Sequence, residues 1–183
     1  MARIVALTYV TLDGVMENPA WTGPYFNDEH AKFAHGQLFA SDALLLGRAT
    51  YDGMAAAWPH MEASEGEFAV RMNTVPKHIV TATLQETEWA GAQILRGDLA
   101  TEVAELKEQY TKDILVYGSG ELTNSLVGLG LVDELKLWIH PVVVGQGKRL
   151  FPDGVAASTW KLATTTTFST GAVVLDYRPA ARA

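Results

Sequence analysis

The chain has 183 residues, about one domain's worth, since domains commonly run roughly 100–200 residues. Its 48% hydrophobic and 19% charged residues provide enough apolar surface for a packed core and exclude wholesale disorder. A formal charge of −7 opposes broad attraction to nucleic acid or anionic membranes. The absence of Cys excludes disulfide scaffolds, thiol catalysis and thiolate metal sites, and fits a reducing cytoplasm.

The first ten residues are apolar only briefly before Asp13 and Gly14 follow, so neither a signal peptide nor a membrane span fits. We therefore expect a cytoplasmic protein with no membrane or nucleic-acid partner. Residues 3–10 are rich in β-branched and apolar side chains without clean alternation. This pattern predicts a central strand that is covered on both faces.

The next elements alternate between helix and strand. Residues 11–26, rich in Gly, Pro and Asn, predict a long irregular loop, and such loops are often functional. Asn27 is expected to cap a helix that ends near Ser41. Residues 43–46 predict a strand, 51–58 a helix, 59–66 a loop, 67–73 a short helix, 77–82 a buried strand and 93–95 a minor strand.

The second half begins with the clearest amphipathic helix, capped by Asp98, with its apolar stripe on Leu99, Val103, Leu106 and Tyr110. Residues 114–117 predict a strand and 121–129 a helix. Residues 135–144 predict a long extended segment at an edge or a subunit contact, and 160–168 with 172–177 predict a hairpin. We expect an α/β fold over residues 1–183 as one domain, with a mixed, mostly parallel sheet flanked by helices.

Two glycine turns follow predicted buried strands. Gly118, Ser119 and Gly120 open a helix, where outward-facing N–H groups suit phosphate oxygens, although glycines there could equally serve only a tight turn. Thr123 stands where the third glycine of G-x-G-x-x-G belongs, and no P-loop motif is present, so Rossmann and P-loop sites are disfavoured.

The second turn, Gly47 to Thr50, adds the guanidinium of Arg48 and the hydroxyl of Thr50 at the start of a helix. In isolation, an exposed Arg with Thr50 as a helix cap explains these residues as well. Phosphate sites at two strand ends of one sheet would suit a dinucleotide.

Other chemistries find little support. His30, His35, His60, His78 and His140 show no metal-ligand spacing, so we predict no metal site. No G-x-S-x-G surrounds Ser119, which disfavours a serine hydrolase.

Several short motifs in a fixed order carry a resemblance to a known family. Leu44–Tyr51, Lys77–Thr81 and Ile114–Leu122 look like dihydrofolate reductase. More narrowly, Thr11–Gly14, Tyr117–Leu122, Gly130–Leu135 and Gly147–Phe151 resemble the C-terminal reductase domain of bacterial riboflavin-biosynthesis deaminase-reductases and their stand-alone relatives. The resemblance covers nearly the whole chain and implies the three-layer dihydrofolate reductase-like fold.

The resemblance also implies NADPH bound across the strand ends. By family analogy Gly47, Arg48 and Thr50 would hold the adenosine-side phosphates, and Thr81 and Ala82 would lie beside the adenosine. The turn would wrap the pyrophosphate through Gly118, Ser119, Gly120, Glu121 and Leu122, while Tyr9 and Tyr117 would lie near the nicotinamide.

This layout leaves a substrate pocket between the first loop and the following helix, where an acid could protonate the acceptor. Asp13 is the first candidate, or else a turn former beside Gly14, and Asp28 or Glu29 is the second. Trp21, with Asp13 and Tyr117, would contact the substrate, or else Trp21 packs on the core surface.

The resemblance implies an NADPH-dependent reductase acting on a pteridine-, pyrimidine- or flavin-related heterocycle. Such an enzyme is similar to 5-amino-6-(5-phosphoribosylamino)uracil reductase or dihydrofolate reductase. Two alternatives stay open, namely a nucleotide-binding protein of the same fold without turnover and a flavin-binding relative. Relatives are commonly homodimers, so a homodimer is expected.

Overall fold

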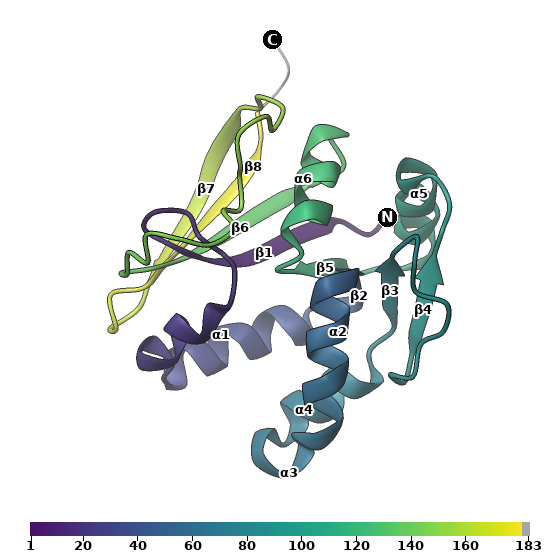
Figure 1. Ribbon diagram of the computed structural model, residues 1–183, viewed down its shortest axis with the longest axis horizontal. Helices are drawn as coiled ribbons and strands as arrows, with labels where there is room; N and C mark the ends of the chain where they lie inside the picture. Colours follow the sequence, from purple (N-terminus) through teal and green to yellow (C-terminus); the bar gives the residue numbers. More distant parts are fainter. Residues whose placement is uncertain (181–183) are drawn as a thin grey trace.

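An eight-stranded sheet in the order β4-β3-β2-β5-β1-β6-β8-β7 forms the centre of the computed structural model, which describes residues 1–180 (Figure 1). Strands β1 to β6 pair in parallel, while β8 runs antiparallel to β6 and β7 antiparallel to β8. The predicted mixed, mostly parallel sheet with a C-terminal hairpin is confirmed. The strands are β1 Ile4–Thr11, β2 Ser41–Gly47, β3 Lys77–Val80, β4 Ala92–Leu95, β5 Asp113–Tyr117, β6 Glu134–His140, β7 Trp160–Thr167 and β8 Val173–Pro179.

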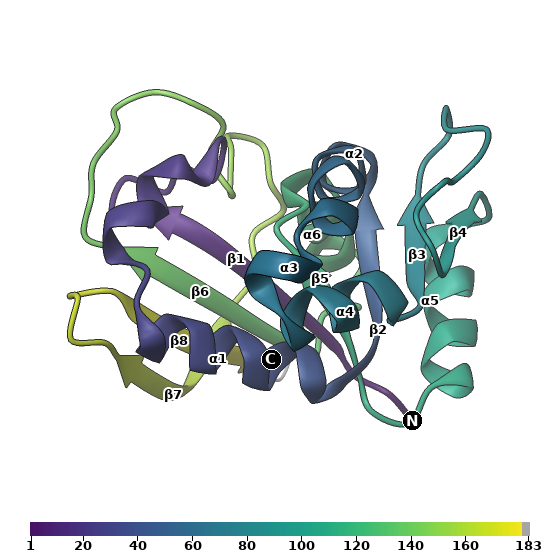
Figure 2. The same ribbon diagram turned by 90° about the horizontal axis from the view of Figure 1, so that it is seen from below.

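Helices cover both faces of the sheet, so the molecule has three layers (Figures 1 and 2). Helices α1 to α4 lie on one face, and α5 and α6 lie on the other. The helices are α1 Asp28–Phe39, α2 Arg48–Ala57, α3 Glu62–Glu65, α4 Glu67–Thr74, α5 Leu99–Gln109 and α6 Gly120–Gly128, with short 3-10 helices η1 Pro19–Tyr25 and η2 Trp58–His60.

Strand β1 contributes side chains to two hydrophobic cores, one on each face of the sheet. Val5 and Leu7 belong to the core beneath α1 and α4, whereas Ile4 and Ala6 belong to the core beneath α5 and α6. All four side chains are buried, because successive strand residues point to opposite faces and both faces carry helices. The predicted central strand is therefore confirmed.

The predicted helix caps are also confirmed. The Asn27 side chain accepts hydrogen bonds from the N–H groups of Glu29 and His30, which starts α1. The Asp98 carboxylate accepts one from Thr101 N–H, which starts α5. Both side chains satisfy backbone donors that have no partner inside the helix.

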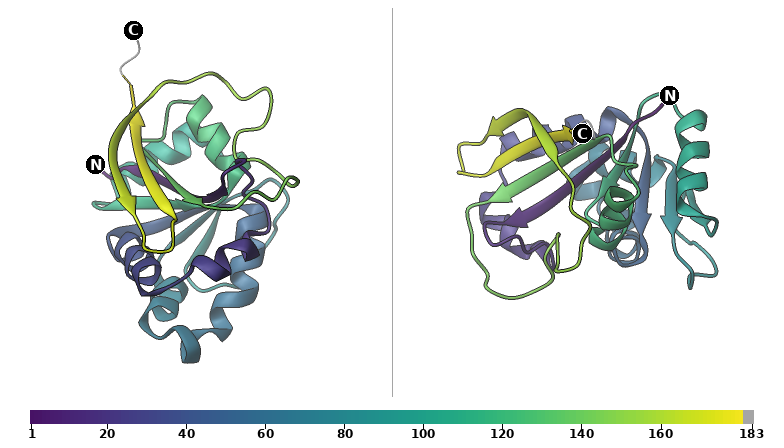
Figure 3. Two further views of the ribbon diagram at one scale, coloured as in Figure 1. Left: turned by 90° about the vertical axis from the view of Figure 1, so that its left-hand side faces the viewer. Right: turned by 90° about the horizontal axis from the view of Figure 1, so that it is seen from above.

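Two predictions about local structure are wrong. Residues 135–144 were expected to form an edge or subunit-pairing strand, but β6 ends at His140 and lies between β1 and β8. Pro141 follows His140 and cannot donate to a ladder, and the β7–β8 hairpin folds back beside β6. The connection from β6 to β7 then loops away from the sheet (Figure 3). Residues 59–66, expected to be loop, contain α3 and most of η2.

Within residues 1–180, no helix has the length and apolar character needed to cross a membrane.

Candidate functional site

The two predicted phosphate-binding turns follow the carboxyl-terminal ends of neighbouring strands in the sheet. Gly47 ends β2 and Tyr117 ends β5, and these two strands pair in parallel. The carboxyl ends of parallel strands share an edge, which is where α/β sheets commonly bind ligands. A Cβ built on Gly47 would lie 3.6 Å from Ser119 Cβ and 3.7 Å from Leu122 Cβ, so the starts of α2 and α6 are close neighbours (Figure 2).

Two hydrogen bonds join the two turns, and a third lies within the turn that contains Ser119. Gly47 N–H donates to Ser119 Oγ at 3.0 Å, and Ser119 N–H donates to Thr50 Oγ1 at 3.1 Å. Ser119 Oγ in turn donates to the Tyr117 carbonyl at 2.9 Å. Thr50 thus supports the neighbouring turn, and no side chain caps α2 within the described residues. The two turns therefore form a single unit, called the paired turn below.

The backbone of the paired turn suits an anion. Gly118 and Ser119 have φ values of 53° and 50°, and successive residues in unusual conformations can gather N–H groups into a concave cradle. No side chain in the described part of the chain caps α6, which leaves the first N–H groups of the helix without intrahelical partners. A Cβ on Gly120 would collide with the Met16 thioether, so the loop after β1 lies against the cradle.

Arg48 lies beside the paired turn but is already paired. Its Nε donates to both carboxylate oxygens of Asp52 at 2.8 Å, and its Nη1 lies 3.4 Å from Thr83 Oγ1. The side chain is 41% exposed, so the remaining guanidinium N–H groups are accessible to a ligand. Arg48 therefore connects α2 to the segment that follows β3.

That segment begins with Thr81 and Ala82. The Thr81 hydroxyl accepts hydrogen bonds from the N–H groups of Thr83 and Leu84, each at 3.2 Å. These bonds fix a turn that exposes Ala82. Both residues predicted beside the adenosine thus lie on the Arg48 side of the site.

The two remaining turn residues differ in their surroundings. Leu122 is buried in the core beneath α5 and α6, which leaves its backbone N–H as the group that a ligand could use. Glu121 is exposed, and its carboxylate lies 3.5 Å from Lys148 Nζ.

Tyr9 and Tyr117 lie further along the same edge. Burial raises the pKa of Tyr9 to about 12 and raises the pKa of Tyr117 still more strongly. The Tyr117 hydroxyl is buried and has no hydrogen-bond partner within residues 1–180. Both phenols are therefore neutral at physiological pH.

Asp13 has a structural role that the sequence did not predict. Its carboxylate accepts hydrogen bonds from the Thr11 hydroxyl at 2.6 Å and from Gly145 N–H at 2.8 Å, and lies 3.3 Å from Val144 N. The Thr11 hydroxyl, followed by Gly145 N–H, lowers the pKa of Asp13. The carboxylate thereby ties the loop after β1 to the loop after β6, and the lowered pKa disfavours the protonated form that a general acid needs.

The other two acidic candidates lie in the first turn of α1. Asp28 is exposed, and its side chain makes no hydrogen bond or ion pair with any residue in 1–180. Glu29 accepts hydrogen bonds from Ser169 N–H at 2.8 Å and from the Ser169 hydroxyl at 2.6 Å, which lower its pKa. Glu29 therefore fixes α1 to the β7–β8 turn.

The Trp21 ring lies beside a histidine that was not among the predicted site residues. This ring lies 5.4 Å from the ring of His140, and the Tyr25 ring lies 6.0 Å from the same imidazole. His30 lies 5.7 Å from His140 and stacks on Trp138 at 4.9 Å. From their spacing in the sequence, the histidines were expected only not to bind a metal. The i, i+4 spacing of His30 with the apolar Ala34 and Leu38 could have placed His30 on the buried face of α1.

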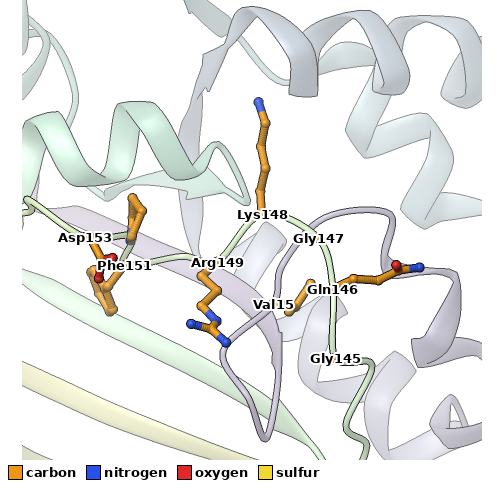
Figure 4. Close-up of a pocket in the computed structure, with 9 residues that line it drawn as sticks. Val15, Gly145, Gln146, Gly147, Lys148, Arg149, Phe151 and Asp153 are labelled. Carbon is orange, nitrogen blue, oxygen red and sulfur yellow. The ribbon is translucent and has the colours of Figure 1, made fainter.

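The glycine-rich loop after β6 borders an open hollow of about 330 Å³ (Figure 4). Met16 N–H donates to the Lys148 carbonyl at 2.9 Å, and Glu17 Oε2 accepts from Lys148 N–H at 3.2 Å. The side chains of Lys148 and Arg149 leave the loop in different directions (Figure 4), so their charges do not converge. The hollow is lined by Val15, Gly145, Gln146, Gly147, Lys148, Arg149, Phe151, Pro152 and Asp153.

No group of three or more His, Cys, Asp or Glu side chains within residues 1–180 is arranged to hold a metal ion.

Comparison with solved structures shows the fold. A pyrimidine reductase-like protein from Corynebacterium diphtheriae superposes with a TM-score of 0.69 at 14% identity, covering 99% of this chain and 93% of that one. The deaminase/reductase of Thermotoga maritima gives 0.69 at 16% identity over 98% of this chain, which spans only 57% of that chain. Dihydrofolate reductase from Enterococcus faecalis, complexed with NADP(H), gives 0.65 at 16% identity over 97% and 96% of the two chains.

Comparison of sequences is more specific. YyaP of Bacillus subtilis strain 168, an uncharacterized protein, is 33% identical over 177 residues, covering 96% of this chain and 94% of its own. Residues 2–174 match the family described as the RibD C-terminal domain. The expected resemblance is thereby confirmed, and the chain belongs to the RibD C-terminal domain family.

Proposed function

We propose that this protein is an NADPH-dependent reductase that transfers a hydride to a C=N or C=C bond of a pteridine-, pyrimidine- or flavin-related heterocycle. The observation that carries the proposal is the paired turn, in which Gly47, Thr50 and Ser119 are joined by hydrogen bonds at two neighbouring strand ends. Membership of the RibD C-terminal domain family supports it. NADPH would supply the hydride, and the chain would supply binding and orientation.

The expected binding mode follows the edge of the sheet. The free N–H groups at the start of α6 would hold the pyrophosphate, and Arg48 and Thr50 would hold the adenosine-side phosphates. Thr81 and Ala82 would flank the adenosine. Tyr9 and Tyr117, on the adjacent strands β1 and β5, would lie near the nicotinamide.

Local donors are needed because the chain carries a formal charge of −7, which opposes the approach of an anionic dinucleotide. The α6 terminus concentrates partial positive charge at one place, and Arg48 adds a full charge beside it. We therefore expect NADPH affinity to fall when either contribution is removed.

Calorimetric titration with NADPH tests the proposal. Gly118→Ala should weaken binding, because φ at this position is +53° and a Cβ would strain the cradle. Arg48→Ala should weaken it by removing the cation. Gly53→Ala and Lys161→Ala serve as matched controls, because Gly53 has no atom near its added Cβ and Lys161 lies on the exposed side of β7. No binding to the parent protein at millimolar NADPH would overturn the proposal.

A panel of pteridine, pyrimidine and flavin compounds then separates turnover from binding. Oxidation of NADPH with one of them, followed at 340 nm, supports the reductase. Binding without oxidation across the panel would instead favour the nucleotide-binding alternative, and a yellow purified protein would favour the flavin-binding one.

We also propose that the protein is a homodimer in the cytoplasm, as its family resemblance implies. Light scattering coupled to size-exclusion chromatography should give twice the 19.9 kDa chain mass. A mass of one chain at micromolar concentration would contradict the dimer.

A further inference from the structure

Two histidines outside the proposed cofactor site have an unusual environment. His30 on α1 and His140 at the end of β6 are both 0% exposed. The Nε2 atom of each is buried and has no hydrogen-bond partner within residues 1–180. Buried polar atoms normally have partners, so two unpartnered atoms in neighbouring rings call for a functional explanation.

The other ring nitrogen of each histidine determines what Nε2 can do. His140 Nδ1 lies 3.1 Å from the Trp138 carbonyl, which can only accept, so Nδ1 carries the proton. His30 Nδ1 lies 3.2 Å from Asn27 Oδ1, an oxygen that already accepts from two backbone N–H groups. Burial lowers the pKa of both imidazoles, which are therefore neutral near pH 7. Each Nε2 is then a hydrogen-bond acceptor without a donor.

The two acceptors belong to one aromatic cluster. The ring centroids of His30 and His140 are 5.7 Å apart, which is close enough for one small heterocycle to contact both rings. Trp138 stacks on His30 with an interplanar angle of 20°, and Phe168 lies 4.6 Å from the same imidazole. Phe168 has no hydrogen-bond donor, and the buried Nε1–H of Trp138 has no partner within residues 1–180, so it bonds to neither Nε2 atom. Both neighbours favour a flat aromatic ligand.

A weakly held segment covers His140. Trp21 and Tyr25 of η1 pack on its ring, yet η1 contains no buried residue. The short hydrogen bond from the Thr22 hydroxyl to the Pro19 carbonyl, at 2.6 Å, lies within η1. The side-chain hydrogen bonds from η1 to other segments are longer, at 3.2 Å from Trp21 Nε1 to the Glu17 carbonyl and 3.5 Å from Tyr25 Oη to the Pro141 carbonyl. Segments with few buried contacts open at low cost, so η1 can move to admit a ligand.

The cluster adjoins the proposed nicotinamide position. Strand β1 lies between β5 and β6, and its Tyr9 pairs with Trp138 in register. The Tyr9 ring lies 5.5 Å from His140. Neighbouring strands are roughly 5 Å apart, so a molecule in the cluster would lie about one strand from the nicotinamide.

We propose that His30 and His140 form a pair of acceptors that recognises the hydrogen-bond-donating edge, a ring N–H or amino group, of the heterocyclic substrate. This inference rests on the proposed reductase function and narrows its substrate class. An edge that carries only carbonyl or carboxylate oxygens would place acceptors against acceptors and would be rejected.

Nitrogen-15 NMR of the histidine side chains tests the pair directly. The probe is 2,4-diaminopyrimidine, and the matched control probe is pyrimidine, which has the same ring without N–H donors. Saturating diaminopyrimidine should shift the Nε2 resonances of both His30 and His140 in the direction of an accepted hydrogen bond, while pyrimidine should not. Unchanged Nε2 resonances at 10 mM diaminopyrimidine would overturn the proposal.

Variants provide a second measurement. His30→Phe and His140→Phe should each weaken diaminopyrimidine binding by about five- to tenfold, the loss expected for one hydrogen bond. The matched control is His35→Phe, since His35 lies on the same helix, stacks on Phe39 and bonds to Glu67 instead. Equal probe affinity in all three variants would contradict the acceptor pair. If a variant fails to fold, the NMR measurement on the unmodified protein still tests the pair.

NADPH titration of the same samples separates the two proposals. NADPH binding with no response of either Nε2 would refute the acceptor pair alone. A response of both Nε2 atoms without NADPH binding would instead refute the reductase proposal and leave the donor-binding cluster standing.

Discussion

Arg48 already has a carboxylate partner in the structure, and a phosphate would have to compete with it. Both oxygens of Asp52 bond to Arg48 Nε. Since an exposed ion pair of this kind is worth about 0–1 kcal/mol, Asp52→Asn should tighten NADPH binding by up to about fivefold. Calorimetry measures the change, and Glu108→Gln on the exposed side of α5 controls for the altered net charge. Weaker binding in Asp52→Asn alone would contradict competition between Asp52 and a cofactor phosphate for Arg48.

Asp13 and Asp28 were both predicted as acids, and their surroundings now predict different effects. Asp13→Ala removes the acceptor of Val144 and Gly145 N–H, so hydrogen exchange at these two amides should become faster. Asp28→Ala should leave both rates unchanged, because Asp28 bonds to neither loop. Equal exchange rates in the parent and Asp13→Ala would contradict the structural role.

The sequence predicted residue roles that depend on neighbours in the chain, but not roles that depend on distant residues. Asn27 and Asp98 were identified as caps because capping depends on neighbours within three positions, which the sequence displays directly. The role of Asp13 depends on Val144 and Gly145, far away in the chain. Likewise, the contact between His30 and His140 forms only when α1 packs against β6, so no local pattern could predict it.

At the scale of elements, replacing glycine by alanine should have opposite effects on stability in α2 and in the paired turn. Gly53 lies inside α2 and has nothing within 4 Å of an added Cβ. Gly53→Ala should therefore stabilise the fold by about 0.5–1 kcal/mol. Gly118→Ala should destabilise it by about 1–2 kcal/mol, because φ is +53° there. Urea unfolding measures both, and a loss of stability in Gly53→Ala would contradict the open space on α2.

The sequence predicted the helices and strands better than it predicted the order of the strands in the sheet. Strand–turn–helix units such as β2 with α2 and β5 with α6 were recognised from local apolar runs and glycines. The position of β6 was not, because whether a strand lies at an edge depends on where later strands pair. Strand β8 of the C-terminal hairpin pairs with β6 on the side away from β1. Nothing in the sequence of residues 135–144 indicates that a later strand pairs there.

For the molecule as a whole, buried histidines predict how stability depends on pH. Burial lowers the pKa of His30, His78 and His140 below their unfolded value of about 6.5. The unfolded chain therefore binds more protons below that pH, and the free energy of unfolding falls as pH drops from about 6.5 towards the folded pKa values. Glu29 and Glu102 oppose this fall at His30 and His78 without reversing it.

Urea unfolding between pH 5 and 8 checks this dependence. His140→Phe should flatten the acid side of the curve, because it removes a buried imidazole whose pKa is lowered. An unchanged slope in His140→Phe would show that His140 is not buried in its neutral form.

The carboxylates of Asp13 and Glu17 each fasten the segment before η1 to the segment after β6. Any displacement of one segment is therefore transmitted to the other, although more than a hundred residues separate them in the chain. Gln146 is exposed in the middle of the second segment, six residues after His140. A fluorophore attached there would report the opening of η1 from a position that no ligand needs to touch.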